Sequence, residues 1–360
     1  MTHYLDHNAS SPLRPEARAA MERALSLGGN PSSVHGAGRA ARRLIEDSRE
    51  QVANLMGVAP RNVIFTSGGT EANALALAGA IDGAVEAGER FTRLFVSAVE
   101  HDSVRGTAAA LAERVPGLRL EAVPVSADGV ADLSRTTLNE GKGRALIAMM
   151  AANNETGVLQ PVDGVDGVLF VDAVQRPGRY DNASYISLSA HKLGGPQGTG
   201  ALIVRDDAPF AAQLLGGGQE RGLRAGTENV AGIAGFGAAA AAWGVLPSAL
   251  RERFEAGLPA SAIVFGRNAP RLPATSNFAL PGIAAETSMM ALDLDGVMVS
   301  SGSACSSGKV KPSHVLQAMG VDDALARCAL RVSFGWNSTD ADVDAALASI
   351  GRLVARREAA

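Results

Sequence analysis

Seven short apolar runs alternate with longer segments of helical periodicity, and this alternation constrains the fold more than any other feature of the chain. The runs cover residues 62–66, 94–98, 118–123, 145–151, 168–171, 185–188 and 199–204. Short, nearly continuous apolar runs are typical of strands that are buried on both faces of a sheet. Because helical segments separate several of these runs, the sequence predicts an α/β fold with a mostly parallel seven-stranded sheet flanked by helices.

The pattern changes after about residue 247 to shorter strands and helices, which predict a second, smaller α+β domain. The expected elements there cover residues 276–280, 286–292 and 330–334, followed by a closing helix at 340–356. We therefore expect a large domain at residues 15–246. The small domain then combines residues 1–14 with residues 247–360, and it carries the loop around Cys305.

Two segments are expected to be helices that cover the sheet. Residues 37–56 place apolar side chains on one face of a 3.6-residue period and end before Gly57, a typical stop signal. Residues 230–246 form an uncharged run, mostly of Ala and Gly, that approaches the length of a membrane span. Its composition favours a buried helix over a membrane span.

Composition excludes several classes of function. The 360 residues carry a net charge of −4, so no global basic field attracts nucleic acid or anionic lipid. The two cysteines, Cys305 and Cys328, are too few for a disulfide framework and lack the spacing of a metal site. The N-terminal residues do not resemble a signal peptide, and we expect a cytoplasmic protein without a metal centre.

Two connections are unusually short. Only residues 153–167 join the run at 145–151 to the run at 168–171, whereas a parallel crossover normally needs a dozen or more residues and usually a helix. We expect a loop here, so part of one sheet face needs another cover. A second shortening lies between residues 244 and 265.

Lys192 is the first candidate for catalysis. The chain has 29 Arg but only four Lys, so arginine is the default surface cation. Lys192 follows the run at 185–188 within the small-residue segment 189–196. An amine can lose its proton and form a Schiff base, which a guanidinium cannot do. A plain surface lysine is the alternative for an isolated residue.

Asp172 stands at the end of the apolar run at 168–171, where an unpaired carboxylate is costly. One partner for it is the protonated ring nitrogen of pyridoxal phosphate (PLP), which the carboxylate would keep charged. A cap or an ion pair explains the residue equally well when it is taken alone.

Residues 65–73 indicate an anion site, because Gly68 and Gly69 join the run at 62–66 to a helical segment. Free backbone N–H groups at a helix start bind phosphate, and glycines allow it to approach closely. The segment is not a P-loop, since no Gly-Lys-Ser/Thr follows.

Further polar groups follow other runs or lie in glycine-rich loops, and each is ambiguous alone. His101 follows the run at 94–98 and could face an aromatic ring or serve as a structural hydrogen-bonding group. Cys305 lies among Ser and Gly, which favours an exposed, reactive thiol, whereas the apolar neighbours of Cys328 indicate packing. Arg331 could clamp a carboxylate or pair with an acid.

Together these motifs resemble the PLP-dependent cysteine desulfurases of the NifS/IscS type, which are fold-type I enzymes. The resemblance begins at Tyr4-Leu5-Asp6, includes residues 29–33 and runs through the motifs above to residues 330–333, so it covers nearly the whole chain.

The resemblance implies a role for each matching residue. Lys192 would bind PLP covalently and move the proton of the substrate Cα, Asp172 would pair with the pyridine nitrogen, and His101 would stack on the ring. Gln175 and Asn154 would address the ring oxygen. The phosphate would be bound by Gly69, Thr70, Ser189 and His191, and Thr227 would reach the phosphate of the neighbouring subunit of a homodimer.

The resemblance also implies the substrate and the products. Arg331, with Asn154 close by, would bind the carboxylate of L-cysteine, and Cys305 would take the sulfur as a persulfide and leave L-alanine. A sulfur-acceptor protein, such as an iron–sulfur scaffold, would then receive the sulfur. Another fold-type I enzyme, such as an aminotransferase or selenocysteine lyase, and a catalytically silent binding protein remain the alternatives.

Overall fold

The computed structural model describes residues 2–136, 144–246, 248–301 and 312–358. Its central sheet has seven strands in the order β2-β8-β7-β6-β5-β3-β4. Only β8 runs antiparallel to its neighbours, so the predicted mostly parallel sheet is confirmed. The bounds are β2 Val63–Thr66, β3 Phe91–Ser97, β4 Arg119–Val123, β5 Arg144–Met150, β6 Val168–Asp172, β7 Ala183–Ser189 and β8 Gly200–Val204.

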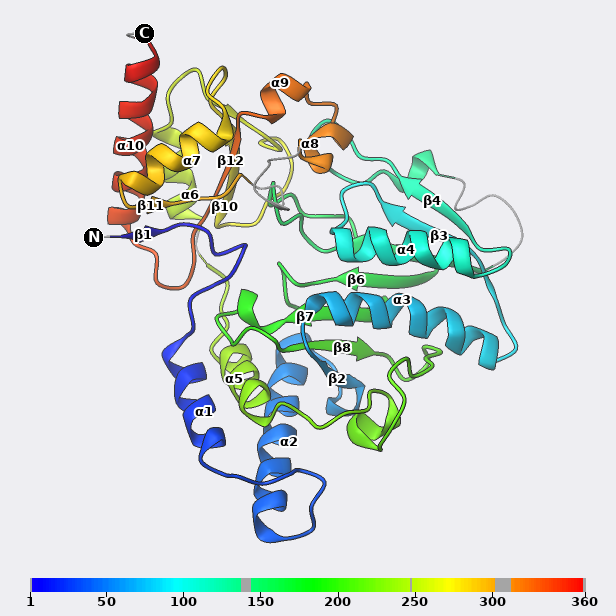
Figure 1. The fold of residues 1–360 in the computed structure, drawn as a ribbon. Coiled ribbons are helices and arrows are strands. Elements are labelled where there is room, and N and C mark those ends of the chain that lie inside the picture. Colours follow the sequence, from blue (N-terminus) through cyan, green and yellow to red (C-terminus); the bar gives the residue numbers. More distant parts are fainter. Residues whose placement is uncertain (1, 137–143, 247, 302–311, 359–360) are drawn as a thin grey trace.

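Helices cover both faces of this sheet, as Figure 1 shows. One face packs against α3 (Gly69–Glu86) and α4 (Asp102–Arg114) through strand residues such as Leu94 and Phe170. The other face packs against α2 (Gly36–Met56) and α5 (Val230–Ala241), and α1 (Pro15–Leu25) lies against α5. Successive strand residues point to opposite faces, so each strand contributes to both cores.

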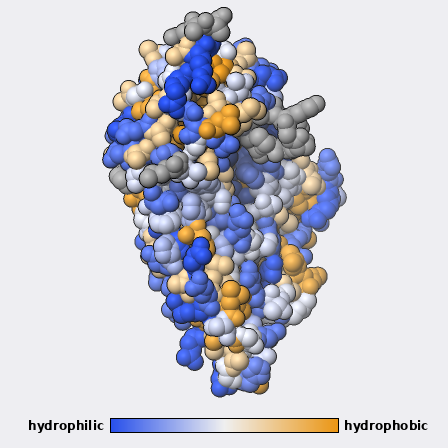
Figure 2. Space-filling view, turned by 60° about the vertical axis from the view of Figure 1, so that its left-hand side comes forward, coloured by the Kyte–Doolittle hydropathy of each residue, from blue (hydrophilic) through white to orange (hydrophobic). Residues whose placement is uncertain are grey.

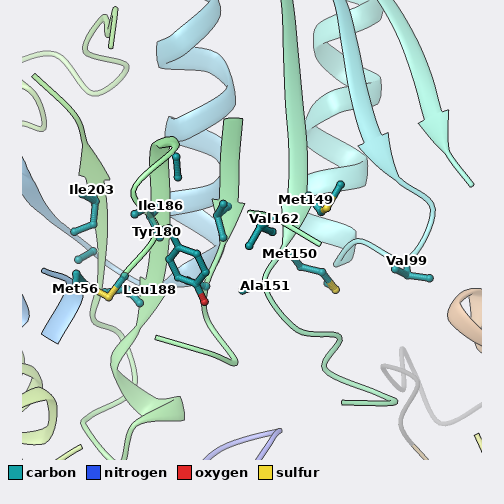
Figure 3. Close-up of a cluster of buried hydrophobic side chains, with 14 of the residues drawn as sticks. Met56, Val99, Met149, Met150, Ala151, Val162, Tyr180, Ile186, Leu188 and Ile203 are labelled. Atoms are coloured by element: carbon teal, nitrogen blue, oxygen red, sulfur yellow. The ribbon is translucent and has the colours of Figure 1, made fainter. Parts of the chain in front are cut away.

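The core on the α2 and α5 side contains Met56, Met149, Tyr180 and Leu188, which Figure 3 shows together. The predicted C-terminal end of the helix at 230–246 is wrong, because α5 ends at Ala241. Its Ala and Gly residues allow close approach: a Cβ on Gly237 would stand 2.6 Å from the backbone of Ser48 in α2. The final residues of that run leave the helix instead.

The remaining elements form a smaller group around two short sheets. Strands β9 (Ile263–Val264), β10 (Thr275–Ala279) and β12 (Ala329–Ser333) pair antiparallel, and β1 (His3–Tyr4) pairs parallel with β11 (Val297–Met298). The helices of this group are α6 (Ala249–Ala256), α7 (Ala285–Leu294), α8 (His314–Ala318), α9 (Asp323–Ala326) and α10 (Asp340–Glu358).

A separate apolar cluster combines Leu5 with residues such as Phe254, Phe278 and Ile350. The buried residues of this cluster all come from the two terminal segments that were assigned to the small domain. Cys328 is buried and packs into the large core, as the sequence predicts. Because α8, α9 and Cys328 contribute to that larger core, the division remains a proposal.

The connection between β5 and β6 contains no helix, as the sequence predicts. Instead it buries Val162 and Val165 in the large core and forms a bridge between Val158 and Arg271. The second short connection keeps one helix, α6. Part of the sheet face is therefore covered by loops.

The surface in Figure 2 is mostly hydrophilic, with apolar residues scattered singly or in small groups. Within the described ranges, no helix combines the length and the apolar character that a bilayer span requires.

Candidate active site

A cavity of about 810 Å³ opens at the carboxyl ends of β3, β5, β6 and β7. Parallel strands bring the residues that follow them to one edge of the sheet, which is where α/β proteins bind ligands. Ten of the twelve predicted site residues line this cavity: Gly69, Thr70, His101, Asn154, Asp172, Gln175, Ser189, His191, Lys192 and Arg331.

Lys192 ends a short 3-10 helix, η3 (Ala190–Lys192), that follows β7 directly. Its Nζ donates to the backbone oxygens of Asn8 and, at 2.9 Å, of Ala9. Burial, aided by the positive charge of Arg331, lowers the pKa of Lys192 to about 8. An appreciable fraction of this amine is therefore uncharged and nucleophilic near neutral pH.

Asp172 is the last residue of β6 and is buried. One carboxylate oxygen accepts from Asn73 Nδ2 at 2.9 Å and the other from the backbone N–H of Val174 at 3.1 Å. Burial raises the pKa of Asp172, whereas these two donors and the charges of His101 and Lys192 lower it. In the described part of the chain no cation lies within hydrogen-bond distance of it.

The start of α3 and the segment after β7 form the end of the cavity that suits an anion. Gly69 opens the 18-residue helix α3, whose first N–H groups have no intrahelical acceptor. A Cβ on Gly69 would stand 3.0 Å from Val174 and 3.4 Å from Ser189, so only glycine fits here without pressing on these side chains. Burial lowers the pKa of His191 to about 4, which keeps its ring neutral.

His101 caps α4: its Nδ1 accepts from the backbone N–H of Ser103 at 3.1 Å. In the neutral ring the proton therefore belongs on Nε2. His101 therefore serves as a structural hydrogen-bonding group, which was one of its two predicted roles. Its ring also lines the cavity.

Arg331 lies on β12 and is almost fully buried, with a side chain 4% exposed. It pairs with Asp6 at 2.5 Å and donates to the backbone oxygen of Asn154 at 2.9 Å. Of the two predicted roles of Arg331, the ion pair with an acid is thus present. Its Nε has no hydrogen-bond partner in the described chain, which leaves one donor of this guanidinium unsatisfied.

Asn8 and Asn73 are site residues to which the sequence analysis gave no role. The carbonyl of Asn8 accepts from Lys192 and, at 3.0 Å, from Gln175 Nε2, so it holds both side chains in place. Asn73 holds Asp172 from the second turn of α3. A signal for Asn73 exists in its spacing, since it lies one turn after Gly69 on the same helix.

Two buried acids near the cavity, Glu100 and Glu155, are also absent from the predicted site residues. Glu100 accepts from the backbone N–H of Met150 at 2.6 Å, and burial, together with the charge of Asp172, raises its pKa well above the ordinary range. Glu155 accepts from Ser313 Oγ at 2.5 Å, and burial raises its pKa as well. Both follow predicted strands, but the sequence does not show that they are enclosed.

The remaining two predicted residues are not in this cavity. Thr227 lines a separate pocket of about 110 Å³ with residues such as Ser67 and Arg224. Cys305 lies outside the described residues.

The residues fit PLP in three respects. Asp172 is a buried carboxylate that faces the cavity without a cation, which suits a protonated pyridine nitrogen. The helix start at Gly69 and Thr70 suits a phosphate. Lys192 provides an amine with a lowered pKa in the same cavity. A metal site has less support, because no group of three His, Cys, Asp or Glu among the described residues could bind one.

Comparison with known proteins identifies the class. Residues 3–346 match the family model described as aminotransferase class-V. The chain is 39% identical to the IscS-like cysteine desulfurase of Mycobacterium tuberculosis, over 98% of this chain and 96% of the relative. It is 41% identical to a cysteine desulfurase of Cereibacter sphaeroides, over 98% of this chain and 95% of the relative.

A solved structure titled NifS-like protein gives a TM-score of 0.88 at 31% identity, covering 99% of this chain and all of that chain. Another, the NifS-like protein of Rickettsia africae, gives a TM-score of 0.85 at 29% identity over 98% of this chain. The alignment with the Mycobacterium relative spans 384 positions, more than the 360 residues of this chain. That relative therefore carries residues that this chain lacks.

This chain is a class-V aminotransferase-fold enzyme that depends on PLP. Within that class it belongs to the cysteine desulfurases of the NifS/IscS type. The predicted family, fold type and cofactor are thereby confirmed.

Proposed function

We propose that this protein converts L-cysteine to L-alanine and holds the released sulfur as a persulfide on Cys305. The observation that carries the proposal is the placement of Lys192 and Asp172 in one cavity, with Arg331 on its wall. When bound, PLP serves as an electron sink that weakens bonds at the substrate Cα and Cβ. The relatives named cysteine desulfurase support the choice of substrate.

In the proposed reaction Arg331 binds the substrate carboxylate, and the pair with Asp6 fixes the orientation of the guanidinium. Lys192 holds the cofactor and then, with its lowered pKa, accepts and returns the proton at the substrate Cα. Asp172 keeps the ring nitrogen protonated, and Asn73 keeps Asp172 in position.

His101 would stack on the bound ring, and because its Nδ1 accepts from the N-terminus of α4, Nε2 is the ring nitrogen left available for the reaction. Gly69, Thr70, Ser189 and His191 would hold the phosphate, while Gln175 and Asn154 would contact the ring oxygen.

Sulfur transfer requires a thiolate. We propose that the sulfur of Cys305 attacks the substrate sulfur, so that a sulfur–sulfur bond forms as the bond between Cβ and sulfur breaks. The electron pair stays with the carbon, which takes up a proton and becomes the methyl group of alanine. The persulfide then passes its outer sulfur to an acceptor protein, such as an iron–sulfur scaffold.

We further propose a cytoplasmic homodimer in which Thr227 reaches the phosphate of the neighbouring subunit. The position of Thr227 in a pocket apart from the cavity of its own chain is compatible with that role.

The proposal is tested by measuring alanine and protein-bound persulfide after adding L-cysteine to the PLP-loaded enzyme. Cys305→Ala should retain the visible absorbance of the bound cofactor but lose persulfide and most alanine formation. Retention of most activity would favour another fold-type I reaction. Cys328→Ala is the matched control, because this second thiol packs in the core and should not affect the persulfide.

A further inference from the structure

A second cavity, of about 430 Å³, adjoins the active-site cavity. Asn8, Val174, Gln175 and Lys192 line both spaces, so these four residues form the wall between them. We call the second space the rear cavity. Its volume falls in the range of cavities that hold drug-sized ligands.

The rear cavity lies where the chain is short. The helix-free connection between β5 and β6 supplies Leu159, and the shortened segment after α5 supplies Val245 and Leu246. None of the described lining residues belongs to an α-helix, so this space is enclosed mostly by loops.

Apolar side chains dominate the lining of the rear cavity. They include Trp243, Leu246, Leu272, Phe334 and Trp336. Large aromatic and aliphatic surfaces of this kind favour a ligand with an apolar body.

The charged residues of the rear cavity are all basic. Besides Lys192 in the shared wall they are Arg14, Arg176 and Arg179, and the described lining contains no Asp or Glu. Arg179 already pairs with Asp181 at 2.6 Å. By contrast, neither Arg14 nor Arg176 forms an ion pair with any carboxylate in the described chain.

Arg14 is held in a fixed position. Its Nε donates to the backbone oxygen of Leu193 at 2.9 Å, and its guanidinium lies 5.3 Å from the centre of the Trp336 ring. Burial lowers the pKa of Arg14, which shows that this cation has lost part of its hydration. An anion beside it would restore the lost stabilisation.

We propose that the rear cavity binds an organic acid with an apolar body, whose carboxylate or sulfonate contacts Arg14 and Arg176 and whose body packs against Trp243 and Trp336. The proposal does not depend on the proposed desulfurase reaction. Since the wall includes Lys192 and Gln175, a ligand here would lie directly behind the cofactor site.

The test uses two fluorescent probes of similar shape on the PLP-loaded enzyme in its native oligomeric state. One is 8-anilino-1-naphthalenesulfonate, and the other is N-phenyl-1-naphthylamine, which lacks the sulfonate. The sulfonate should bind saturably, at one site per chain, and more tightly than the neutral probe. Saturating L-alanine should not displace it, because alanine occupies the other cavity.

Arg176→Gln should raise the Kd of the sulfonate about tenfold, the change expected when one charge-assisted hydrogen bond is lost. The same variant should leave the Kd of the neutral probe unchanged. Arg18→Gln is the matched control, because Arg18 is an exposed arginine on α1, one turn after Arg14, and does not line the cavity.

Gly178→Phe tests the volume of the cavity independently of its charge. A Cβ on Gly178 would meet no atom within 4 Å, so the variant is expected to fold, and an unchanged Tm would verify this. The phenylalanine ring should occupy part of the cavity and weaken the binding of both probes. The proposal is overturned if the native enzyme binds no sulfonate saturably, as would happen if the partner subunit fills the cavity. It is also overturned if both probes bind equally well, or if Arg176→Gln and Gly178→Phe both leave binding unchanged.

Discussion

The two cavities on either side of Lys192 are built from the same wall but differ in how their polar groups are arranged. In the active-site cavity, acids, amides and bases hold one another in fixed positions, as Asn73 holds Asp172 and Asp6 holds Arg331. In the rear cavity, Arg14 and Arg176 line a mostly apolar space, and no acid is among the described lining residues. The difference shows that residues at the carboxyl ends of the strands make the reactive site, whereas loops build most of the cavity behind it.

The largest expected effect comes from Lys192, which belongs to both cavities. Lys192→Ala should lower alanine formation about 10²–10⁴-fold or more, because a positioned proton-transfer group contributes that much and the covalent attachment is lost as well. Alanine production by the purified variant, supplied with excess PLP, measures the effect.

Lys192→Arg sharpens this comparison, because it keeps the positive charge of the shared wall but cannot lose its proton. It should be as inactive as Lys192→Ala and should still bind the sulfonate probe in the rear cavity. Substantial alanine formation by the arginine variant would contradict the role of the free amine.

Asp172→Asn should have the next largest effect. The amide can still accept from Val174, but it lacks the charge that keeps the ring nitrogen protonated. A carboxylate partner shifts a pKa by about 1–3 units, so alanine formation should fall about 10- to 1,000-fold. Asp181→Asn makes the same chemical change beside the rear cavity, where Asp181 pairs with Arg179, and should leave alanine formation unaffected.

Arg331→Lys should act mainly on substrate binding. A lysine retains the charge but not the planar fork that contacts Asp6 and a carboxylate together. The KM for L-cysteine should rise about tenfold, with a smaller change in kcat, because a charge-assisted hydrogen bond is lost. Steady-state kinetics separate the two constants. An unchanged KM would show that Arg331 does not bind the substrate and only forms the ion pair with Asp6.

The smallest effect concerns pH. Because the pKa of Lys192 is lowered to about 8, the uncharged fraction of its amine rises from pH 7 and is nearly complete above pH 9. The rate at which the cofactor-free enzyme captures PLP should therefore rise about tenfold between pH 7 and pH 9 and then level off. Stopped-flow absorbance follows the capture. A rate that keeps rising to pH 10 would indicate an ordinary lysine.

Much of the fold could be predicted from the sequence because strand burial leaves a direct pattern. All seven predicted strands lie in the sheet, and the helix-free connection after β5 follows from its length alone. The end of α5 could not be predicted, since residues 242–246 are as apolar as the helix that precedes them. Only packing determines where such a helix stops.

The candidate site was predictable where a reactive residue follows a strand, as Lys192 and Asp172 do. The role of Asn8 was harder to predict from the sequence, because Asn8 acts through its backbone carbonyl, which every residue type has. The rear cavity could not be foreseen, because it combines residues from segments that lie far apart in the sequence, among them Arg14, Arg176, Leu246 and Trp336.

The most direct test of the account is the position at which the cofactor is attached. Borohydride reduction of the PLP-loaded enzyme fixes the cofactor to the amine that holds it, and peptide mass spectrometry then locates it. The chain offers only four lysines, at positions 142, 192, 309 and 311. We predict that the reduced cofactor is found on the peptide containing Lys192. Attachment to any of the other three, or to none, would contradict the account.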